Sequence, residues 1–160
     1  MIRKITIDDF EQWKKLRLEA VRQYPQSFGQ SYSGVQKQDR KWCTDSLKNG
    51  DIFTYEQNGK MVAIAGIYSM KPENMRHRAV LFGMYVKPEF HKQGIASALI
   101  NHIIDDIKPS HKQLQLTVTT TNNPAIELYK KHGFVIYGTD PDALLVDGKY
   151  YDEYLMIKKL

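Results

Sequence analysis

The spacing of apolar residues changes several times along the chain, and each change predicts a new element. Near-helical spacing over Phe10–Val21 predicts a helix, and a less regular pattern over Val35–Leu47 predicts a second one. The stretch Tyr24–Gly34 between them is rich in Pro, Ser, Gly and Gln, which is typical of a loop. Apolar residues that recur on one face from Ile95 to Ile107 predict a third, longer helix.

Shorter apolar runs, several of them alternating with polar residues, predict the strands. These are Ile2–Ile5, Asp51–Tyr55, Lys60–Ser69, Arg78–Val86, Gln113–Thr119, Phe134–Tyr137 and Lys149–Ile157. Asn58-Gly59 predicts a hairpin turn, because both residues tolerate positive φ. We interpret Asn123 as the N-cap of the last helix, followed by Pro124 and ended by Gly133. The pattern therefore predicts one mixed α/β domain, residues 1–160, with a central sheet of about seven strands and about four helices.

Composition and charge narrow the function classes only modestly. With 23 basic and 18 acidic residues the net charge is +5, which favours anionic ligands, but the basic residues form no stripe typical of nucleic-acid binding. No apolar run approaches the ~20 residues of a membrane helix, and the N-terminus lacks a signal-peptide core. The single cysteine, Cys43, suits a reducing compartment and is expected to be a packed residue of a helix rather than an activated nucleophile. We therefore expect a cytoplasmic protein with neither a membrane nor a nucleic-acid partner.

The first candidate binding site is Gln93–Ala96, between a predicted strand and a predicted helix. The first amides of a helix lack intrahelical partners and attract anions. Gly94 permits positive φ and a close ligand, while His91 and Lys92 add donors and positive charge. A phosphate or pyrophosphate would fit these groups. A glycine before a helix is more often a plain turn, and neither common nucleotide fingerprint is present.

Two motifs, taken in order, resemble the GNAT superfamily of acyl-CoA N-acyltransferases. The first is Met84–Ile100, whose turn keeps the glycine and the final small residue of the family pattern Arg/Gln-x-x-Gly-x-Gly/Ala but has His91 at its first position. The second is Asn122–Phe134, which matches Asn-x-x-Ala-x-x-Leu-Tyr-x-x-x-Gly-Phe at every named position. The closing run Tyr150–Met156 also resembles the last strands of many members. The resemblance implies the GNAT fold, with the fourth and fifth strands splayed apart.

Carried over by position, the resemblance implies acetyl-CoA as cosubstrate and no metal ion. The turn would bind the coenzyme A pyrophosphate through main-chain amides, and the end of the fourth strand would pair with the pantetheine arm. Asn122 would contact the pantetheine, because Asn123 is taken as the cap. The implied coenzyme-binding residues are Met84, Tyr85, Val86, His91, Lys92, Gln93, Gly94, Ile95, Ala96, Ser97, Asn122, Ala125 and Tyr129.

The implied reaction is acetyl transfer to a primary amine by direct attack in a ternary complex. A main-chain N–H near Val86 is the expected oxyanion donor, and Tyr129 is the candidate general acid, unless its ring only packs the helix. The carboxylate that many relatives carry on the fourth strand is absent from Leu81–Met84. The base is left unassigned, with these alternatives: Asp152, Glu153, Tyr150 and ordered water.

The acceptor is less defined than the donor. The loop Tyr24–Tyr32, which commonly walls the acceptor site of this fold, offers aromatic and amide groups but no acidic residue. It favours a small amine, an amino-acid amine or a peptide amine over a polycation. One alternative function is a catalytically silent acyl-CoA-binding or regulatory module, because the fourth-strand carboxylate is missing. A nucleic-acid-binding domain, suggested by the pI of about 9.2, is more distant. Both a monomer and a homodimer fit the sequence.

Overall fold

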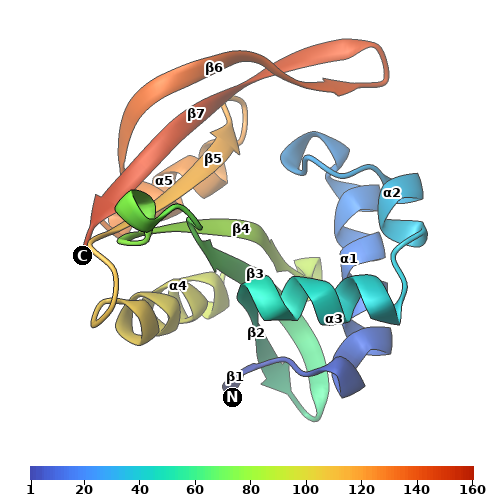
Figure 1. Cartoon of the computed structure of the whole chain (residues 1–160). Helices are drawn as coiled ribbons and strands as arrows, with labels where there is room; N and C mark the ends of the chain where they lie inside the picture. Colours follow the sequence, from blue (N-terminus) through green and yellow to red (C-terminus); the bar gives the residue numbers. More distant parts are fainter.

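A seven-stranded sheet runs through the middle of the molecule, with helices on both of its faces (Figure 1). The computed structural model describes all 160 residues. The strands lie in the order β1-β2-β3-β4-β5-β7-β6, and only β4 and β5 pair in parallel. Their bounds are β1 Ile2–Lys4, β2 Gly50–Gln57, β3 Lys60–Ser69, β4 Arg78–Val86, β5 Gln113–Thr119, β6 Val135–Val146 and β7 Lys149–Lys159. The predicted α/β class and all seven strands are confirmed.

Five α-helices flank the sheet, one more than the pattern predicts. They are α1 Phe10–Gln23, α2 Tyr32–Gln36, α3 Arg40–Asn49, α4 Ile95–Ile107 and α5 Asn123–Lys131. Single 3-10 turns add Ile7–Asp9, Pro25–Ser27, Glu73–Met75 and Pro88–Phe90. Helices α1, α2 and α3 cover one face of the sheet, and α4 and α5 cover the other (Figure 1). None of these helices is both long and apolar enough to cross a membrane.

The single helix predicted over Val35–Leu47 is wrong, because the chain forms two helices there. Asp39 breaks the pattern: its backbone is extended and its carboxylate accepts a 2.8 Å hydrogen bond from the Trp42 N–H, which caps α3. Ser31 caps α2 in the same way through the Gly34 N–H, so the predicted loop ends before Tyr32. Short polar side chains favour such caps over helix interiors, and this local preference outweighs the weak apolar periodicity.

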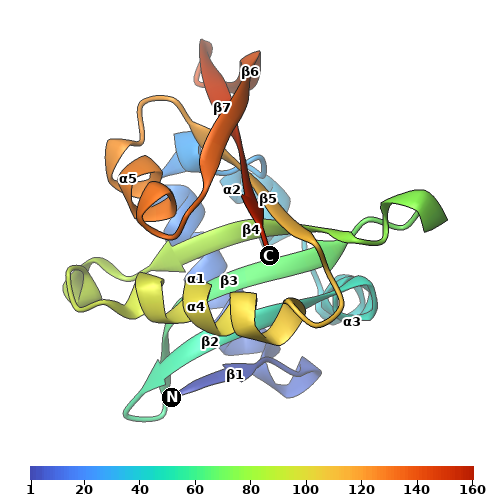
Figure 2. The ribbon, with the colours of Figure 1, turned by 90° about the vertical axis from the view of Figure 1, so that its left-hand side faces the viewer.

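β4 and β5 separate soon after they meet, as the resemblance implies. Their ladder joins Arg78–Val80 to Gln113–Gln115 and then stops. On the other side of β4, the pairing with β3 shifts register between Ile64 and Gly66, where Gly83 adopts a φ of +61°. Such a bulge bends a strand and strengthens its twist. β4 therefore turns away from β5, and Figure 2 shows the two strands diverging towards α5.

The core has two parts, one on each face of the sheet. The larger part packs α4 and α5 against the strands, and Leu99, Ile100 and Ile103 of α4 are fully buried in it. The smaller part packs α1 and α3 against β2 and β3, and Cys43 of α3 is fully buried in it, as expected. Both strands beside the gap belong to the larger part, which contains Leu81 of β4 and Leu114 of β5.

The C-terminal hairpin is longer than predicted. β6 extends from Val135 to Val146 rather than ending at Tyr137, and it crosses two irregularities near Gly138 and Asp142. Turn-forming residues in this stretch predicted a loop, whereas the pairing with β7 continues across them as bulges. The hairpin overhangs α1 and α2 (Figure 1), which places β7 above the face where those helices lie.

The helix cap of α5 is Asn122, not Asn123, which corrects the expected assignment. The Asn122 carboxamide oxygen accepts a hydrogen bond from the Ala125 N–H at 3.3 Å, whereas Asn123 is the first helical residue and Pro124 the second. Asn122 is therefore committed to the helix through its oxygen. Its amide nitrogen, which has no partner within the protein, remains free to donate to a ligand.

Asn122→Ala should lower the free energy of unfolding by about 1 kcal/mol, the usual effect of losing a side-chain cap. Asn123→Ala is the matched control and should change stability by less than about 0.5 kcal/mol, because it removes no capping bond. Urea unfolding of the two variants, without ligand, measures both values. The opposite ranking would show that Asn123 is the cap after all.

Candidate active site

A row of unpaired main-chain donors lies where β4 gives way to α4. The N–H groups of all six residues from Lys92 to Ser97 donate to no acceptor within the protein. Lys92 and Gly94 adopt φ values of +60° and +78°, which turn successive amides to one side of the chain. A Cβ placed on Gly94 would meet nothing within 4 Å, so the main chain there is open to a ligand. This row, Lys92–Ser97, is called the amide cradle below.

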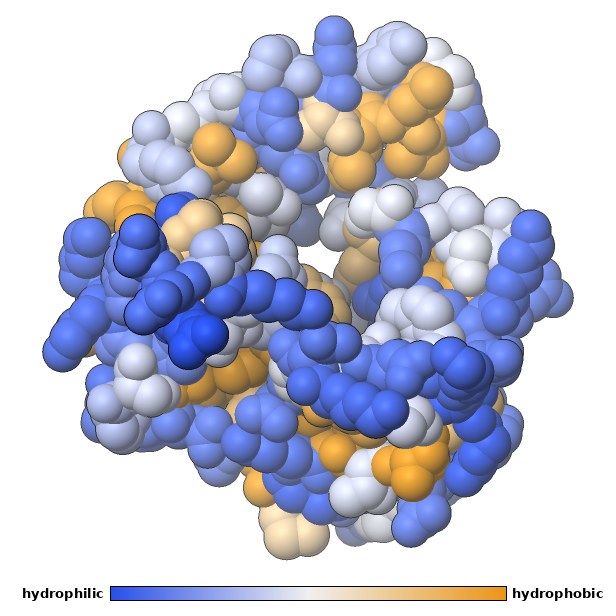
Figure 3. Space-filling model, in the orientation of Figure 1, coloured by the Kyte–Doolittle hydropathy of each residue, from blue (hydrophilic) through white to orange (hydrophobic).

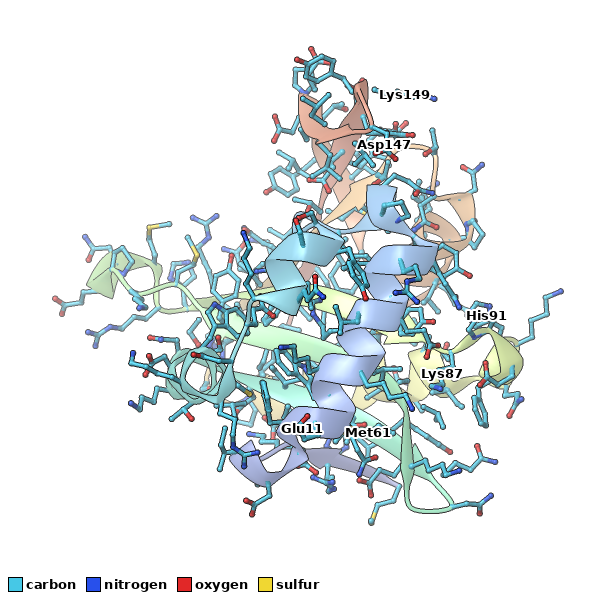
Figure 4. The ribbon with its side chains drawn as sticks, turned by 90° about the vertical axis from the view of Figure 1, so that its right-hand side faces the viewer. Glu11, Met61, Lys87, His91, Asp147 and Lys149 are labelled. Atoms are coloured by element: carbon cyan, nitrogen blue, oxygen red, sulfur yellow. The ribbon has the colours of Figure 1, made fainter.

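His91 is turned towards the strand. Its Nε2 lies 2.8 Å from the carbonyl oxygen of Val86. Because a carbonyl can only accept, Nε2 must carry a proton in this arrangement. Lys87, between the two, forms an ion pair with Glu19 at 3.3 Å, and both Lys87 and His91 lie at the same edge of the molecule in Figure 4. The assignment of the His91 side chain to the coenzyme stays a prediction.

The main-chain N–H of Val86 points into the gap between β4 and β5. The neighbouring Lys87 N–H donates to the Val62 carbonyl on β3, and donors alternate in direction along a strand. The N–H of Val86 is therefore directed away from β3. Tyr85 behaves differently, because its side chain faces α1 and its hydroxyl donates to Glu19 at 2.8 Å.

Tyr129 lies on the α4–α5 face of the sheet and is only 7% exposed. His132, one turn later on α5, ties this helix to α4 through 3.0 Å hydrogen bonds with Ser97 and Asn101. Tyr129 is thereby held beside the first turns of α4, close in the fold to the amide cradle. Its hydroxyl has no hydrogen-bond partner in the protein, and burial raises its pKa to about 12. The phenol therefore stays protonated and available as a donor at neutral pH.

A cavity of about 820 Å³ opens on the opposite face of the sheet. It is lined by the loop Ser27–Gln30, as expected for Tyr24–Tyr32, by Trp42 of α3 and by Leu81–Gly83 of β4. Thr117 of β5 and Glu153 of β7 complete it, so the cavity borders both strands that diverge. Figure 3 shows this hollow between the β6–β7 hairpin and the helices α1 and α2.

Of the three residues among the alternative bases, Glu153 is the one that lines this cavity. Burial raises the pKa of its carboxyl group, the Thr117 hydroxyl partly offsets this, and the charge of Asp140 raises it further. Asp152 instead accepts a hydrogen bond from the Asp142 N–H and holds the bulged hairpin, while Tyr150 is 59% exposed outside the cavity. The structure thus supplies a carboxylate from β7 where β4 has none.

Arg17 also lines the cavity, and sequence reasoning missed it. It is buried at 7% exposure and has no acidic partner. The available signal was its position: Arg17 follows Trp13 by four residues and precedes Val21 by four, so it falls within the buried face of α1. A single cationic residue on the apolar face of a helix indicates a buried charge, and such a residue is a candidate for binding a ligand.

The chain belongs to the acetyltransferase (GNAT) family, whose model matches residues 13–134. An L-amino acid N-acetyltransferase of Escherichia coli is 39% identical over 79 residues, which are 48% of this chain and 49% of that protein. The [ribosomal protein bS18]-alanine N-acetyltransferase of Escherichia coli is 39% identical over 83 residues, 51% of this chain and 53% of that protein. These matches therefore span about half the length of the curated relatives.

Among solved structures, a Salmonella typhimurium protein determined with its cofactor acetyl-CoA superposes with a TM-score of 0.84 at 17% identity, covering 100% of this chain and 93% of that one. At this identity the similarity concerns the fold. The shared fold agrees with the family assignment, and the expected membership is confirmed.

The free energy of unfolding should fall as the pH drops below about 6.5, the ordinary pKa of histidine. Burial lowers the pKa of His132, and the charges of Lys131 and Lys158 lower it further. The unfolded chain then binds a proton more readily than the folded one, so acid favours unfolding. In His132→Gln the loss of stability between pH 7 and pH 5, measured by urea unfolding, should be smaller. An unchanged pH dependence would contradict this account.

Proposed function

We propose that the protein transfers an acetyl group from acetyl-CoA to a primary amine by direct attack in a ternary complex. The observation that carries the proposal is the amide cradle, six consecutive unpaired N–H groups at the start of α4. It lies beside the gap between β4 and β5, and a cavity large enough for a small acceptor borders the same gap from the other face. Donor and acceptor would thus meet between the two strands.

The donor half of this site is built mainly from the main chain. The cradle offers N–H groups and the positive end of the α4 dipole to the coenzyme pyrophosphate. Met84–Val86 offers an unpaired strand edge to the pantetheine arm, in the manner of an added strand. The Asn122 amide nitrogen and Ala125 lie at the start of α5 on the other side of the gap. The family assignment supports acetyl-CoA as the ligand.

The transition state needs a donor for the oxyanion, and the Val86 N–H is our assignment. When the amine attacks, the carbonyl oxygen of the thioester gains negative charge, and a fixed N–H in the gap stabilises it without reorganisation. Losing one such donor typically costs about 2.7–4 kcal/mol of barrier. The bond from carbon to nitrogen forms, the bond from carbon to sulfur breaks, and the thiolate leaves with the electron pair.

Glu153 would accept a proton from the amine, and Tyr129 would donate a hydrogen bond to the departing thiolate. Glu153 accepts the proton that the attacking amine loses, and a raised pKa makes its carboxylate a better base than an exposed one. Tyr129 faces the departing sulfur as a hydrogen-bond donor. With a pKa of about 12, full transfer to a thiolate whose acid has a pKa near ~8.5 is uphill by roughly 5 kcal/mol. We therefore assign Tyr129 to stabilising the thiolate. The thiolate then takes the second proton, which the nitrogen loses once its bond to carbon has formed, the first having gone to Glu153.

A thiol-release assay with acetyl-CoA over a panel of amines tests the proposal directly. Steady release of coenzyme A thiol that depends on the amine is the expected result, with the acetylated amine found by mass spectrometry. The silent-module alternative predicts binding of acetyl-CoA, seen by calorimetry, without thiol release from any amine. That second outcome would overturn the proposed activity while leaving the donor site intact.

Tyr129→Phe should lower kcat by about 10²-fold, the usual range for losing one hydrogen-bond donor to a charge that develops in the transition state. The dissociation constant of acetyl-CoA should change by less than about threefold, because the Phe ring keeps the packing against Phe134. Tyr55→Phe, at a half-buried tyrosine of β2, is the control and should retain activity. Equal losses of turnover and of coenzyme affinity would mean that the phenol only positions the cofactor.

Glu153→Gln should lower kcat/KM by about 10²-fold and remove the acid limb of its pH profile. The wild-type rate should rise with pH as the carboxyl group loses its proton, with the midpoint above the ordinary pKa of glutamate. Glu127→Gln, on the exposed face of α5 and paired with Lys130, is the control and should leave the profile unchanged. An acid limb that survives in Glu153→Gln would exclude Glu153 as the base.

A further inference from the structure

We propose that the acceptor is a free amino acid and that Arg17 binds its carboxylate. The inference rests on the proposed function, because it names the acceptor of the same site. Arg17 reaches from α1 into the cavity that borders the gap between β4 and β5, and it is 7% exposed. A buried guanidinium in a substrate-sized cavity calls for an anionic partner, and none is present within the protein.

The contacts of Arg17 leave most of its donors free. Nη2 donates to the Gln30 carboxamide oxygen at 2.7 Å, an oxygen that also accepts from Gln38 Nε2 at 3.0 Å. Nε is fully buried and has no partner. The guanidinium carbon lies 5.7 Å from the centre of the Phe28 ring. One neutral amide and one ring face therefore hold a positive charge that burial disfavours, as the lowering of the pKa of Arg17 to about 10 reflects.

The strand beside Arg17 leaves room for this group. A Cβ added to Gly83 of β4 would stand 3.1 Å from Arg17 Nη1, closer than nearly all such contacts. Gly83 also holds a φ of +61° in the bulge that opens the gap. The guanidinium thus lies directly against β4, immediately before Met84–Val86, where the thioester would be held. A carboxylate bound there would place the amine of the same small molecule towards the reacting carbon.

The other charged residues that line the cavity either have a hydrogen-bond or ion-pair partner within the protein or are exposed to solvent. Asp39 accepts the capping hydrogen bond from Trp42, and Asp45 forms ion pairs with Lys41 at 2.9 Å and with Lys48. Lys71 is exposed on the loop after β3. Arg17 and Glu153 are therefore the two charges, one of each sign, that the protein leaves without an ion-pair partner in the inner part of the cavity.

One cation and one anion without ion-pair partners match a zwitterion. The carboxylate would form two parallel hydrogen bonds with the guanidinium, the geometry that arginine favours, while the ammonium would face Glu153, which then takes its proton. The side chain would lie against aromatic rings: Phe82 covers Gly66 and lies 5.8 Å from Tyr68. Both rings are 40% exposed within the cavity lining. This surface fits an apolar amino-acid side chain.

Three amines that share the leucine side chain provide the test: L-leucine, L-leucinamide and 3-methylbutylamine. Each is assayed for thiol release with acetyl-CoA. The carboxylate is intact in the first, neutral in the second and missing in the third. We expect kcat/KM for L-leucine to exceed the other two by roughly 10²-fold. L-leucinamide has a less basic amine than L-leucine, so a larger fraction of it is neutral and reactive. A preference for L-leucine would therefore be seen despite this chemical disadvantage.

Arg17→Gln should lower kcat/KM for L-leucine by roughly 10²-fold and leave L-leucinamide within about threefold, so that the preference disappears. Arg22→Gln, on the exposed side of the same helix, is the matched control and should keep the preference. If Arg17 only held the loop at Gln30, all three amines would lose turnover alike. Arg17→Met should fold with undiminished thermal stability, because it removes a buried unpaired charge; a large destabilisation would support the structural role instead.

Further outcomes separate the two proposals. Turnover of L-leucinamide or of the dipeptide Leu-Gly at or above that of L-leucine would overturn amino-acid recognition and keep the acetyltransferase. Absence of thiol release from every amine would overturn the proposed activity. In that case the thermal shift caused by L-leucine alone still reports on Arg17: it should be present in the wild type and absent in Arg17→Gln, and a shift equal in both would overturn the inference.

Discussion

β4 leaves β5 after Val80, and the main-chain groups of β4 that lose their sheet partners there form one part of the proposed site. The bulge at Gly83 bends β4, so the ladder that begins at Arg78 cannot continue. A sheet normally satisfies its own donors and acceptors, and an internal edge is costly unless something fills it. One apolar core contains Leu81 of β4 together with Leu114 of β5, and a second core packs Tyr85 of β4 against α1. The proposed binding site is thus an interruption of the sheet that the packing of the strands supports.

Much of this arrangement could be predicted from the sequence, because it depends on local signals. Arg78–Val86 and Gln113–Thr119 have the predicted bounds, and Asn58-Gly59 forms the expected turn with φ values of +52° and +71°. Gly94 heads α4 with the positive φ that its position required. In each case the residue types that define the element are neighbours in the chain, so short-range patterning is sufficient.

Most of the wrong predictions concern features that the folded chain, rather than the local sequence, decides. Asn122 and Asn123 are both good caps, and only the tertiary path of the chain decides which one adopts the cap position. The bulges of β6 depend on the pairing with β7, which no local pattern records. The break at Asp39 differs, because its cap is a local signal that the apolar periodicity concealed. Arg17 was missed for a related reason: helical periodicity assigns it to the buried face, and only the folded cavity shows that no carboxylate meets it there.

The proposed site divides in the same way: local sequence encodes the half that binds the acetyl donor, and the tertiary fold assembles the half that binds the acceptor. The donor half is made of consecutive amides and one strand edge, so a short motif encodes it and many sequences can share it. The acceptor half combines α1, β4, β5 and β7, whose contributions are far apart in the chain. An arginine on the first helix and a glutamate on the last strand can each change without disturbing the amide cradle. Acceptor choice can therefore diverge among proteins of one fold while the donor stays constant. Here the charges in the cavity, rather than the family pattern, carry the information about the amine.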